Sequence, residues 1–248
     1  MLRILDMPRA DRLPPPPAVP PYSPAVAVAG ESEARIPGLS GGPSLEARVH
    51  APTSAPRAIV LCHPHPLYGG SMHSPVPLAI AKCLADHSAA PAAPRDRAAW
   101  VRFNFRGVGA SDGRYDDGRG EVDDVCAAIG HARRLAPGAL VTVCGHSFGS
   151  FVGLRAAARD KGVDRLLLLA PSTRFFAFRD SALSFGGKTT IFVGDLDELC
   201  DVSEARALAS YLGADLRVFE GFDHHFMKSR RAMAEAALPV IAPEATSP

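Results

Sequence analysis

The spacing of hydrophobic positions along the chain separates predicted strands from predicted helices. From about Ser32 onward, short β-branched or aliphatic runs alternate with alanine-rich stretches, the pattern of βαβ units and a mostly parallel sheet. The apolar runs predict seven strands, at residues 44–50, 57–62, 99–105, 140–145, 164–170, 189–193 and 215–219. The alanine-rich stretches predict five helices, at residues 75–87, 120–135, 148–160, 202–212 and 226–240.

The order of polar and apolar residues within these runs also predicts how the elements are arranged. The first strand, at 44–50, alternates polar and apolar residues, as an antiparallel edge strand does, whereas the later strands are continuous apolar runs typical of strands buried on both faces. Only 18 residues separate the strands at 164–170 and 189–193, so a large cap domain does not fit between them. We therefore expect an α/β fold, a mostly parallel twisted sheet with helices on both faces and no large cap domain.

Residues 1–30 differ in composition from the rest of the chain. They hold eight of the 23 prolines, and proline fixes φ and lacks the N–H that a sheet or helix needs. We expect a disordered, proline-rich tail at 1–30 that is dispensable for stability, followed by a single domain at 31–248. The apolar run at 25–29 leaves one alternative open, in which it covers an apolar patch of the domain.

Composition and charge narrow the classes of function. The 248 residues are 47% hydrophobic, and 27 basic against 26 acidic residues give a net charge of +1, so nothing favours nucleic acid or an anionic membrane as a partner. No apolar stretch approaches the roughly 18–20 residues that cross a bilayer, and no secretory run is visible at the N-terminus. Five cysteines without close C-x-x-C pairs predict free thiols in a reducing, cytoplasmic compartment.

The sharpest chemical motif is Gly145-His146-Ser147-Phe148-Gly149, a G-x-S-x-G. It directly follows a predicted apolar strand and precedes a predicted helix, which is the context that a nucleophile elbow requires. In such an elbow the serine takes strained backbone angles, and small flanking residues let the turn pack closely. A glycine-rich turn with an incidental serine is the alternative interpretation.

With four further motifs, the elbow resembles the α/β-hydrolase superfamily, specifically its small lidless members near the dienelactone-hydrolase and short-chain esterase types. The resemblance covers roughly residues 40–240, and the further motifs are His63-Pro-His-Pro-Leu-Tyr-Gly-Gly70, Phe103-Asn-Phe-Arg-Gly-Val-Gly-Ala-Ser-Asp-Gly113, Gly194-Asp-Leu-Asp197 and Gly221-Phe-Asp-His-His-Phe226. It implies that Ser147 is a nucleophile, activated by a histidine whose tautomer a carboxylate fixes.

The resemblance places the two partners of the serine in two late loops. The family pattern G-x-x-D puts the carboxylate at Asp197; its competitor is Asp195, which would otherwise be a hydrogen-bonding turn residue. The family's D-H dipeptide falls on Asp223 and His224 and makes His224 the base. A shift of this loop by one residue would make His225 the base instead.

Acyl transfer through a tetrahedral intermediate also needs at least two donors for the developing oxyanion. The resemblance implies the backbone N–H of Phe148, directly after the nucleophile, and that of His65, which aligns with the family's H-G-x pattern. Pro64 and Pro66 have no N–H, so the second donor is His65 or lies beyond Pro66.

Two motifs also admit other chemistry. His63, His65 and His73 include an H-x-H spacing found in hydrolytic zinc sites, but the usual following Asp-His ligands are absent. The glycines of residues 102–113 fit neither a Walker loop nor a dinucleotide fingerprint. The resemblance to the α/β hydrolases implies instead a structural strand and turn that supports the site.

The sequence therefore predicts a serine hydrolase of a small soluble ester or thioester that needs no cofactor or metal. Three aromatic residues lie where a cap would sit, and they either line an acyl or alcohol pocket or belong to the core: Phe175, Phe176 and Phe178. An acyltransferase or peptidase with the same triad, or a non-catalytic binding protein on the same fold, remains an alternative. The substrate's acyl and alcohol parts and the oligomeric state do not follow from the sequence.

Overall fold

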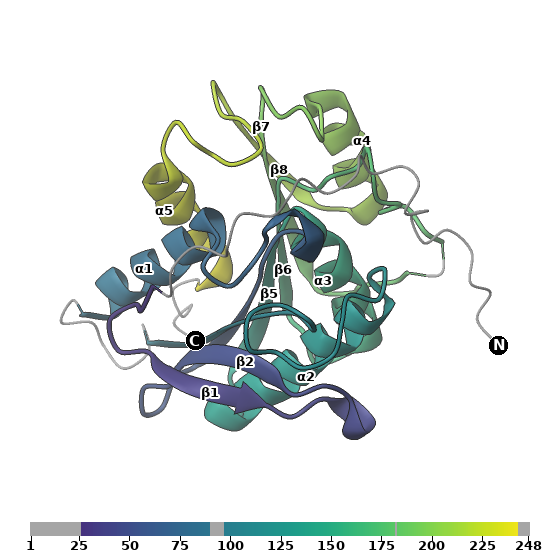
Figure 1. Cartoon of the computed structure of the whole chain (residues 1–248). Helices are drawn as coiled ribbons and strands as arrows, with labels where there is room; N and C mark the ends of the chain where they lie inside the picture. The colour runs from purple at the N-terminus through teal and green to yellow at the C-terminus, as the bar shows by residue number, and fades with distance from the viewer. Residues whose placement is uncertain (1–25, 90–96, 182, 243–248) are drawn as a thin grey trace.

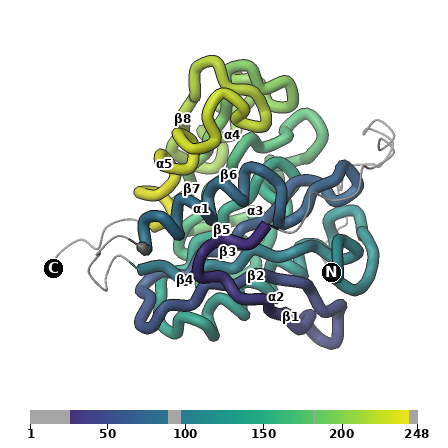
Figure 2. Tube along the Cα trace, turned by 60° about the vertical axis from the view of Figure 1, so that its left-hand side comes forward, coloured from purple at the N-terminus to yellow at the C-terminus, as the bar shows by residue number. Residues whose placement is uncertain are grey.

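One sheet runs through the computed structural model, which describes residues 26–89, 97–181 and 183–242. Within these ranges eight strands pair in the order β1-β2-β4-β3-β5-β6-β7-β8. Their bounds are β1 (Ser32–Ile36), β2 (Leu45–His50), β3 (Arg57–Cys62), β4 (Ala98–Phe103), β5 (Leu140–His146), β6 (Arg165–Leu169), β7 (Lys188–Gly194) and β8 (Asp215–Phe219). Strands β1 and β8 lie at opposite ends of the sheet (Figure 2).

The pairing is parallel except at one end. β2 pairs antiparallel with β1 and β4, and every other neighbouring pair, from β4–β3 to β7–β8, is parallel. All six residues of β3, in the middle of the sheet, are buried. This burial on both faces explains the continuous apolar run that predicted the strand.

Helices cover both faces of the sheet. Their bounds are α1 (Pro75–Ala89), α2 (Arg119–Leu135), α3 (Phe148–Arg159), α4 (Val202–Leu212) and α5 (Arg230–Ile241), with short 3₁₀ turns η2 (Leu39–Gly41) and η3 (Pro66–Tyr68). α1 and α5 pack on one face, and α2, α3 and α4 on the other (Figure 1). No helix in the described ranges combines the length and apolarity needed to cross a bilayer.

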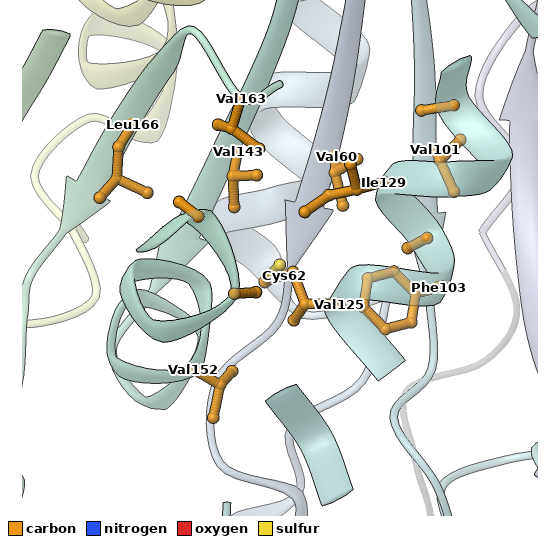
Figure 3. Close-up of a cluster of buried hydrophobic side chains, with 14 of the residues drawn as sticks. Val60, Cys62, Val101, Phe103, Val125, Ile129, Val143, Val152, Val163 and Leu166 are labelled. Atoms are coloured by element: carbon orange, nitrogen blue, oxygen red, sulfur yellow. The ribbon is translucent and has the colours of Figure 1, made fainter. Parts of the chain in front are cut away.

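The two apolar layers take alternate residues of each central strand. In β3, Ile59 and Leu61 join the cluster beneath α1 and α5, whereas Val60 and Cys62 join the one beneath α2 and α3. Figure 3 shows the second cluster, where side chains of α2 and α3 meet those of the central strands. The period-2 alternation therefore sends successive side chains to two separate cores.

The predicted edge strand is wrong in one respect. The strand predicted at 44–50 is antiparallel, but it is β2, and it pairs on both sides because β1 precedes it. β1 was not predicted because, of its five residues, only Ile36 is buried, so it carries no alternating apolar signal. The edge of the sheet is thus a short, largely polar strand, which suits an edge that must not pair further.

The last helix begins later than predicted. Residues 226–229 form a turn in which Phe226 has a φ of +51°, and α5 begins only at Arg230. Ser229 caps that helix, its hydroxyl accepting a hydrogen bond from the Ala232 N–H at 3.1 Å.

Val28, within the predicted tail, and Glu31, just after it, pack on the domain, while residues 1–25 lie outside the described ranges. Val28 is 5% exposed and joins the cluster beneath α1 and α5. Glu31 forms an ion pair with Arg102 at 2.6 Å, both side chains being fully buried, and accepts a hydrogen bond from Trp100 Nε1. Burial raises the pKa of Glu31, but the hydrogen bonds from Arg102 and Trp100 outweigh it and leave the pKa below its ordinary value.

The connection between β6 and β7 is short, as expected. It spans the 18 residues between Leu169 and Lys188, and its described part contains turns and bends rather than helices or strands. The carboxyl ends of β3, β5, β6, β7 and β8 therefore open onto a group of short loops. Ligands of open parallel sheets bind at this end of the strands.

Candidate active site

Ser147 occupies a strained turn between β5 and α3. Its backbone angles are φ +57° and ψ −115°, a region that a side chain other than glycine rarely adopts. The flanking positions must be glycine because neighbouring backbone atoms lie too close for a side chain. A Cβ on Gly145 would lie 2.2 Å from the Gly149 carbonyl oxygen, and one on Gly149 would lie 2.5 Å from the Cys62 carbonyl oxygen. Strand, turn and helix thus have the arrangement that the motif predicted.

Three side chains from three loops form one hydrogen-bonded chain. Ser147 Oγ lies 3.0 Å from His224 Nε2, and His224 Nδ1 lies 3.0 Å from each carboxylate oxygen of Asp197. The carboxylate can only accept, so Nδ1 carries the proton and the neutral ring accepts the Ser147 hydroxyl proton at Nε2. All three side chains are buried.

The loop after β7 separates the roles of its two aspartates. Asp197 Oδ1 also accepts the backbone N–H groups of Leu199 at 2.8 Å and Cys200 at 3.1 Å, which fix the carboxylate toward the histidine. Asp195 lies elsewhere and accepts the N–H of Gly221 at 2.6 Å. Asp195 thus ties the loop after β7 to the loop after β8, as a turn residue does.

The loop after β8 brings His224, and not His225, to the serine. His224 is 2% exposed, whereas His225 lies at the surface with its ring edge-on to that of His224 at 5.2 Å between centroids. Asp223 accepts the N–H of Met227 at 2.7 Å and closes the turn. The one-residue shift considered for this loop is therefore absent.

Two backbone N–H groups beside Ser147 are available as donors. Phe148 is the first residue of α3, and His65 follows Pro64 in the loop after β3. Among the described residues, neither N–H donates to another protein group. A helix N-terminus favours negative charge, so the Phe148 N–H is well placed for an oxyanion.

The histidines of the loop after β3 use their ring nitrogens on protein partners. His63 Nδ1 donates to the Pro64 carbonyl at 2.6 Å, and its Nε2 accepts the Phe105 N–H at 3.1 Å. His65 Nδ1 accepts the Leu67 N–H at 3.2 Å, so its Nε2–H faces the Tyr115 hydroxyl at 3.1 Å. Burial lowers the pKa of His63 to about 3 and that of His65 to about 4.

The third histidine of the zinc hypothesis faces a cation. His73 Nδ1 lies 3.2 Å from an Arg102 guanidinium nitrogen and accepts the Val26 N–H. Within the described residues, no three His, Cys, Asp or Glu side chains are grouped so as to hold a metal ion. The hydrogen bonds instead give these rings a structural role in shaping the loop.

The segment at 102–113 supports the same loop. Asn104 Oδ1 accepts the Met72 N–H at 2.8 Å, and Arg102 donates to the Met72 carbonyl at 3.0 Å. Its glycines allow close packing: a Cβ on Gly109, whose φ is +55°, would lie 2.5 Å from Asn104 Nδ2. The segment is a strand end and turn, as the family resemblance implied.

A cavity of about 300 Å³ opens beside Ser147 and His224. Tyr68, Phe175, Phe176 and Leu199 are among the residues that line it, and none of its lining residues in the described ranges is Lys, Arg, Asp or Glu. Phe178 does not line it, but packs against the Phe151 ring at 5.7 Å in the core. Phe175 and Phe176 therefore line the cavity, whereas Phe178 belongs to the core.

Comparison with known proteins identifies the fold. The family model described as the alpha/beta hydrolase fold matches residues 57–187, which is 131 of the 248 residues. This protein belongs to that family. The α/β-hydrolase architecture accounts for the mostly parallel sheet and for an elbow at the carboxyl end of β5.

Individual relatives cover most of this α/β hydrolase. The uncharacterized protein RP471 of Rickettsia prowazekii is 29% identical over 204 residues, 77% of this chain and 82% of that protein. XC6422 from Xanthomonas campestris, described as an a/b serine hydrolase without lid, is 26% identical with a TM-score of 0.74, over 92% of this chain and 100% of that one. An alpha-beta serine hydrolase homologue from Coxiella burnetii is 28% identical with a TM-score of 0.70. The match covers 86% of this chain and 97% of that one.

Sequence reasoning missed two residues that contact this group. Ser172 Oγ lies 2.8 Å from Ser147 Oγ, and His146 Nε2 lies 3.0 Å from the His224 carbonyl oxygen. Ser172 belongs to a segment that matched no motif; the available signal was its place just after β6, the strand beside β5. His146 occupies the variable position of the elbow motif, where spacing carries no information on its role.

Proposed function

We propose that this α/β hydrolase is a serine hydrolase that cleaves small, uncharged esters or thioesters through an acyl-enzyme on Ser147. The observation that carries the proposal is the buried hydrogen-bonded chain from Ser147 through His224 to Asp197. A serine hydroxyl is a weak nucleophile at neutral pH, and an adjacent neutral imidazole is the base that activates it.

Acylation uses each member of the chain in turn. Ser147 Oγ attacks the carbonyl carbon of the ester while its proton passes to His224 Nε2, and Asp197 stabilises the imidazolium that forms. The N–H groups of Phe148 and His65 donate to the carbonyl oxygen as it becomes negative. The imidazolium then protonates the leaving alcohol or thiol.

Deacylation reverses these roles. Water adds to the acyl carbonyl carbon, His224 takes the water's proton, and the bond between carbon and Ser147 Oγ breaks as Oγ regains a proton from Nε2. These steps need no cofactor. XC6422, the similar structure described as a serine hydrolase without lid, supports the reaction class.

The cavity beside Ser147 supports the substrate class. Its volume of about 300 Å³ and aromatic walls suit a short acyl group. Among the described residues that line it, no Lys, Arg, Asp or Glu offsets the desolvation of a substrate carboxylate or ammonium. The preference for neutral acyl groups follows from this lining.

A panel of p-nitrophenyl esters tests the proposal. Straight chains from acetate to decanoate, the matched thioesters and a hemisuccinate ester would be compared by kcat/KM. We expect a maximum at short neutral chains, a decline for long ones and poor turnover of the hemisuccinate. Turnover that persists in Ser147→Ala, or faster cleavage of anilides than of esters, would contradict the proposal.

A further inference from the structure

The hydroxyl of Ser172 is the second hydrogen-bond partner of Ser147 Oγ. The two oxygens lie 2.8 Å apart, and Ser172 is 1% exposed. Among the described residues, Ser147 Oγ is the only hydrogen-bond partner of the Ser172 hydroxyl. Because the proton of Ser147 is already donated to His224 Nε2, the bond between the two serines runs from Ser172 O–H to Ser147 Oγ.

The backbone holds this hydroxyl in place. Ala170, just after β6, has a φ of +47° and donates its N–H to the Phe192 carbonyl at 2.8 Å. The Ser172 carbonyl then accepts the N–H groups of Phe175 and Phe176 at 3.1 and 3.0 Å. The turn that presents two walls of the cavity therefore also aims Ser172 at the nucleophile.

We propose that Ser172 is a catalytic residue for deacylation, whose hydroxyl stabilises Ser147 Oγ as the leaving group of the acyl-enzyme. The inference rests on the proposed acyl-enzyme function. The proposed role follows because the strength with which Ser147 Oγ accepts a hydrogen bond changes during the catalytic cycle. In the acyl-enzyme, Oγ is the single-bonded oxygen of an ester, whose lone pair is delocalised into the carbonyl, so it accepts a hydrogen bond poorly.

Deacylation restores the hydrogen bond. When water adds to the carbonyl carbon the delocalisation ends, and when the carbon–Oγ bond breaks the electron pair stays on Oγ, which takes its proton from His224 Nε2. The Ser172 hydrogen bond strengthens through both steps and lowers the barrier. During acylation Oγ changes in the opposite direction. The Ser172 hydrogen bond is then stronger in the free enzyme than in the transition state, so it does not accelerate acylation.

One slow acylating agent measures both halves of the cycle. With p-nitrophenyl dimethylcarbamate, release of one equivalent of p-nitrophenolate reports attack by Ser147, and recovery of esterase activity after removal of the reagent reports attack by water. In Ser172→Ala we expect recovery to slow by about three- to tenfold, the effect of one neutral hydrogen bond, and carbamoylation to be unchanged or faster. Ser172→Thr, which keeps the hydroxyl, should recover at close to the wild-type rate.

Thr173→Val is the matched control. It removes the neighbouring hydroxyl, which donates to Glu204 Oε2 at 2.6 Å and faces away from the nucleophile, so both rates should remain those of the wild type. A residue that only holds the turn would slow both reactions together. That result in Ser172→Ala, or an unchanged recovery rate, would overturn the role of Ser172. Failure of the wild type to release p-nitrophenolate would instead contradict the acyl-enzyme itself.

Discussion

The ring of His146 holds the backbone of His224. His146 Nε2–H donates to the His224 carbonyl oxygen at 3.0 Å, and the two rings lie 5.3 Å apart between centroids. Burial, with the nearby His224 ring as a smaller cause, keeps the pKa of His146 well below its ordinary value, so the ring stays neutral. The residue next to Ser147 in sequence thus contacts the loop that carries His224.

His146→Leu should therefore lower kcat about tenfold with little change in KM, because the His224 loop loses its anchor while the substrate cavity is retained. His146→Gln keeps an N–H donor and should recover most of the loss. Steady-state kinetics on a short p-nitrophenyl ester, with thermal melts to verify folding, measure both. Equal losses in the two variants would mean that ring packing matters and the hydrogen bond does not.

The two aspartates after β7 form a matched pair. We expect Asp197→Asn to lower kcat by about 10³- to 10⁴-fold, because the amide favours the wrong histidine tautomer. Asp195→Asn changes a turn contact to Gly221 and should lower kcat much less. Esterase kinetics of both variants at one pH make the comparison, and the reverse ranking would contradict the assignment.

The two adjacent histidines form a second pair. His224→Ala removes the proposed base and should lower kcat about as much as Asp197→Asn, since members of such a chain act as a unit. His225→Ala alters an exposed ring that lines the cavity but is not the partner of Ser147 Oγ, so kcat should stay within a few-fold of the wild type. The double variant Asp197→Asn/His224→Ala should be little worse than either single one. Additive losses would argue against a shared function.

The sequence could predict features that depend on local patterns and motifs, but not contacts between residues far apart in the chain. β3 and α2 follow from local periodicity, because one strand is buried on both faces and one helix on a single face. The three side chains of the buried chain follow from motifs in a known order. The contacts of Ser172 and His146 join residues 25 and 78 positions apart, respectively, and only the packing of β5, β6 and the loop after β8 creates them.

Buried neutral histidines should make the fold sensitive to acid. Unfolded histidine has a pKa of about 6.5, whereas the folded values of His63 and His65 are about 3 and 4. The unfolded chain therefore binds more protons as pH falls below about 6.5, and each such histidine costs about 1.4 kcal/mol of stability per pH unit. At pH 5 this amounts to about 2 kcal/mol for each residue.

Thermal melts between pH 7.5 and 5 measure this effect. The melting temperature of the wild type should fall steadily below pH 6.5, and His63→Gln, although less stable at pH 7.5, should show a shallower decline. His87→Gln, which changes an exposed side chain, should keep the wild-type slope. A His63→Gln slope equal to that of the wild type would show that this histidine does not contribute.

The buried ion pair between Glu31 and Arg102 makes the N-terminal segment part of the fold. Glu31→Gln leaves the Arg102 charge uncompensated and should destabilise the protein by about 3–5 kcal/mol. Glu33→Gln breaks the ion pair with Arg48 on a side chain that is 80% exposed. This change should lower the melting temperature by no more than about 3 °C.

Truncation tests the same segment without a polar substitution. A chain that begins at residue 32 should melt at least about 6 °C below one that begins at residue 26, since it also loses buried Val28. Equal melting temperatures would show that residues 26–31 do not stabilise the fold.

A covalent probe tests directly whether Ser147 is the nucleophile. Incubation with a fluorophosphonate, followed by proteolysis and mass spectrometry, locates the phosphonylated residue. The proposed mechanism predicts one adduct per chain, on Ser147, absent in Ser147→Ala and formed much more slowly in His224→Ala, with Ser172 unmodified. An adduct on Ser172 or elsewhere in the wild type, or labelling that persists in Ser147→Ala, would contradict the central claim that Ser147 is the nucleophile of this hydrolase.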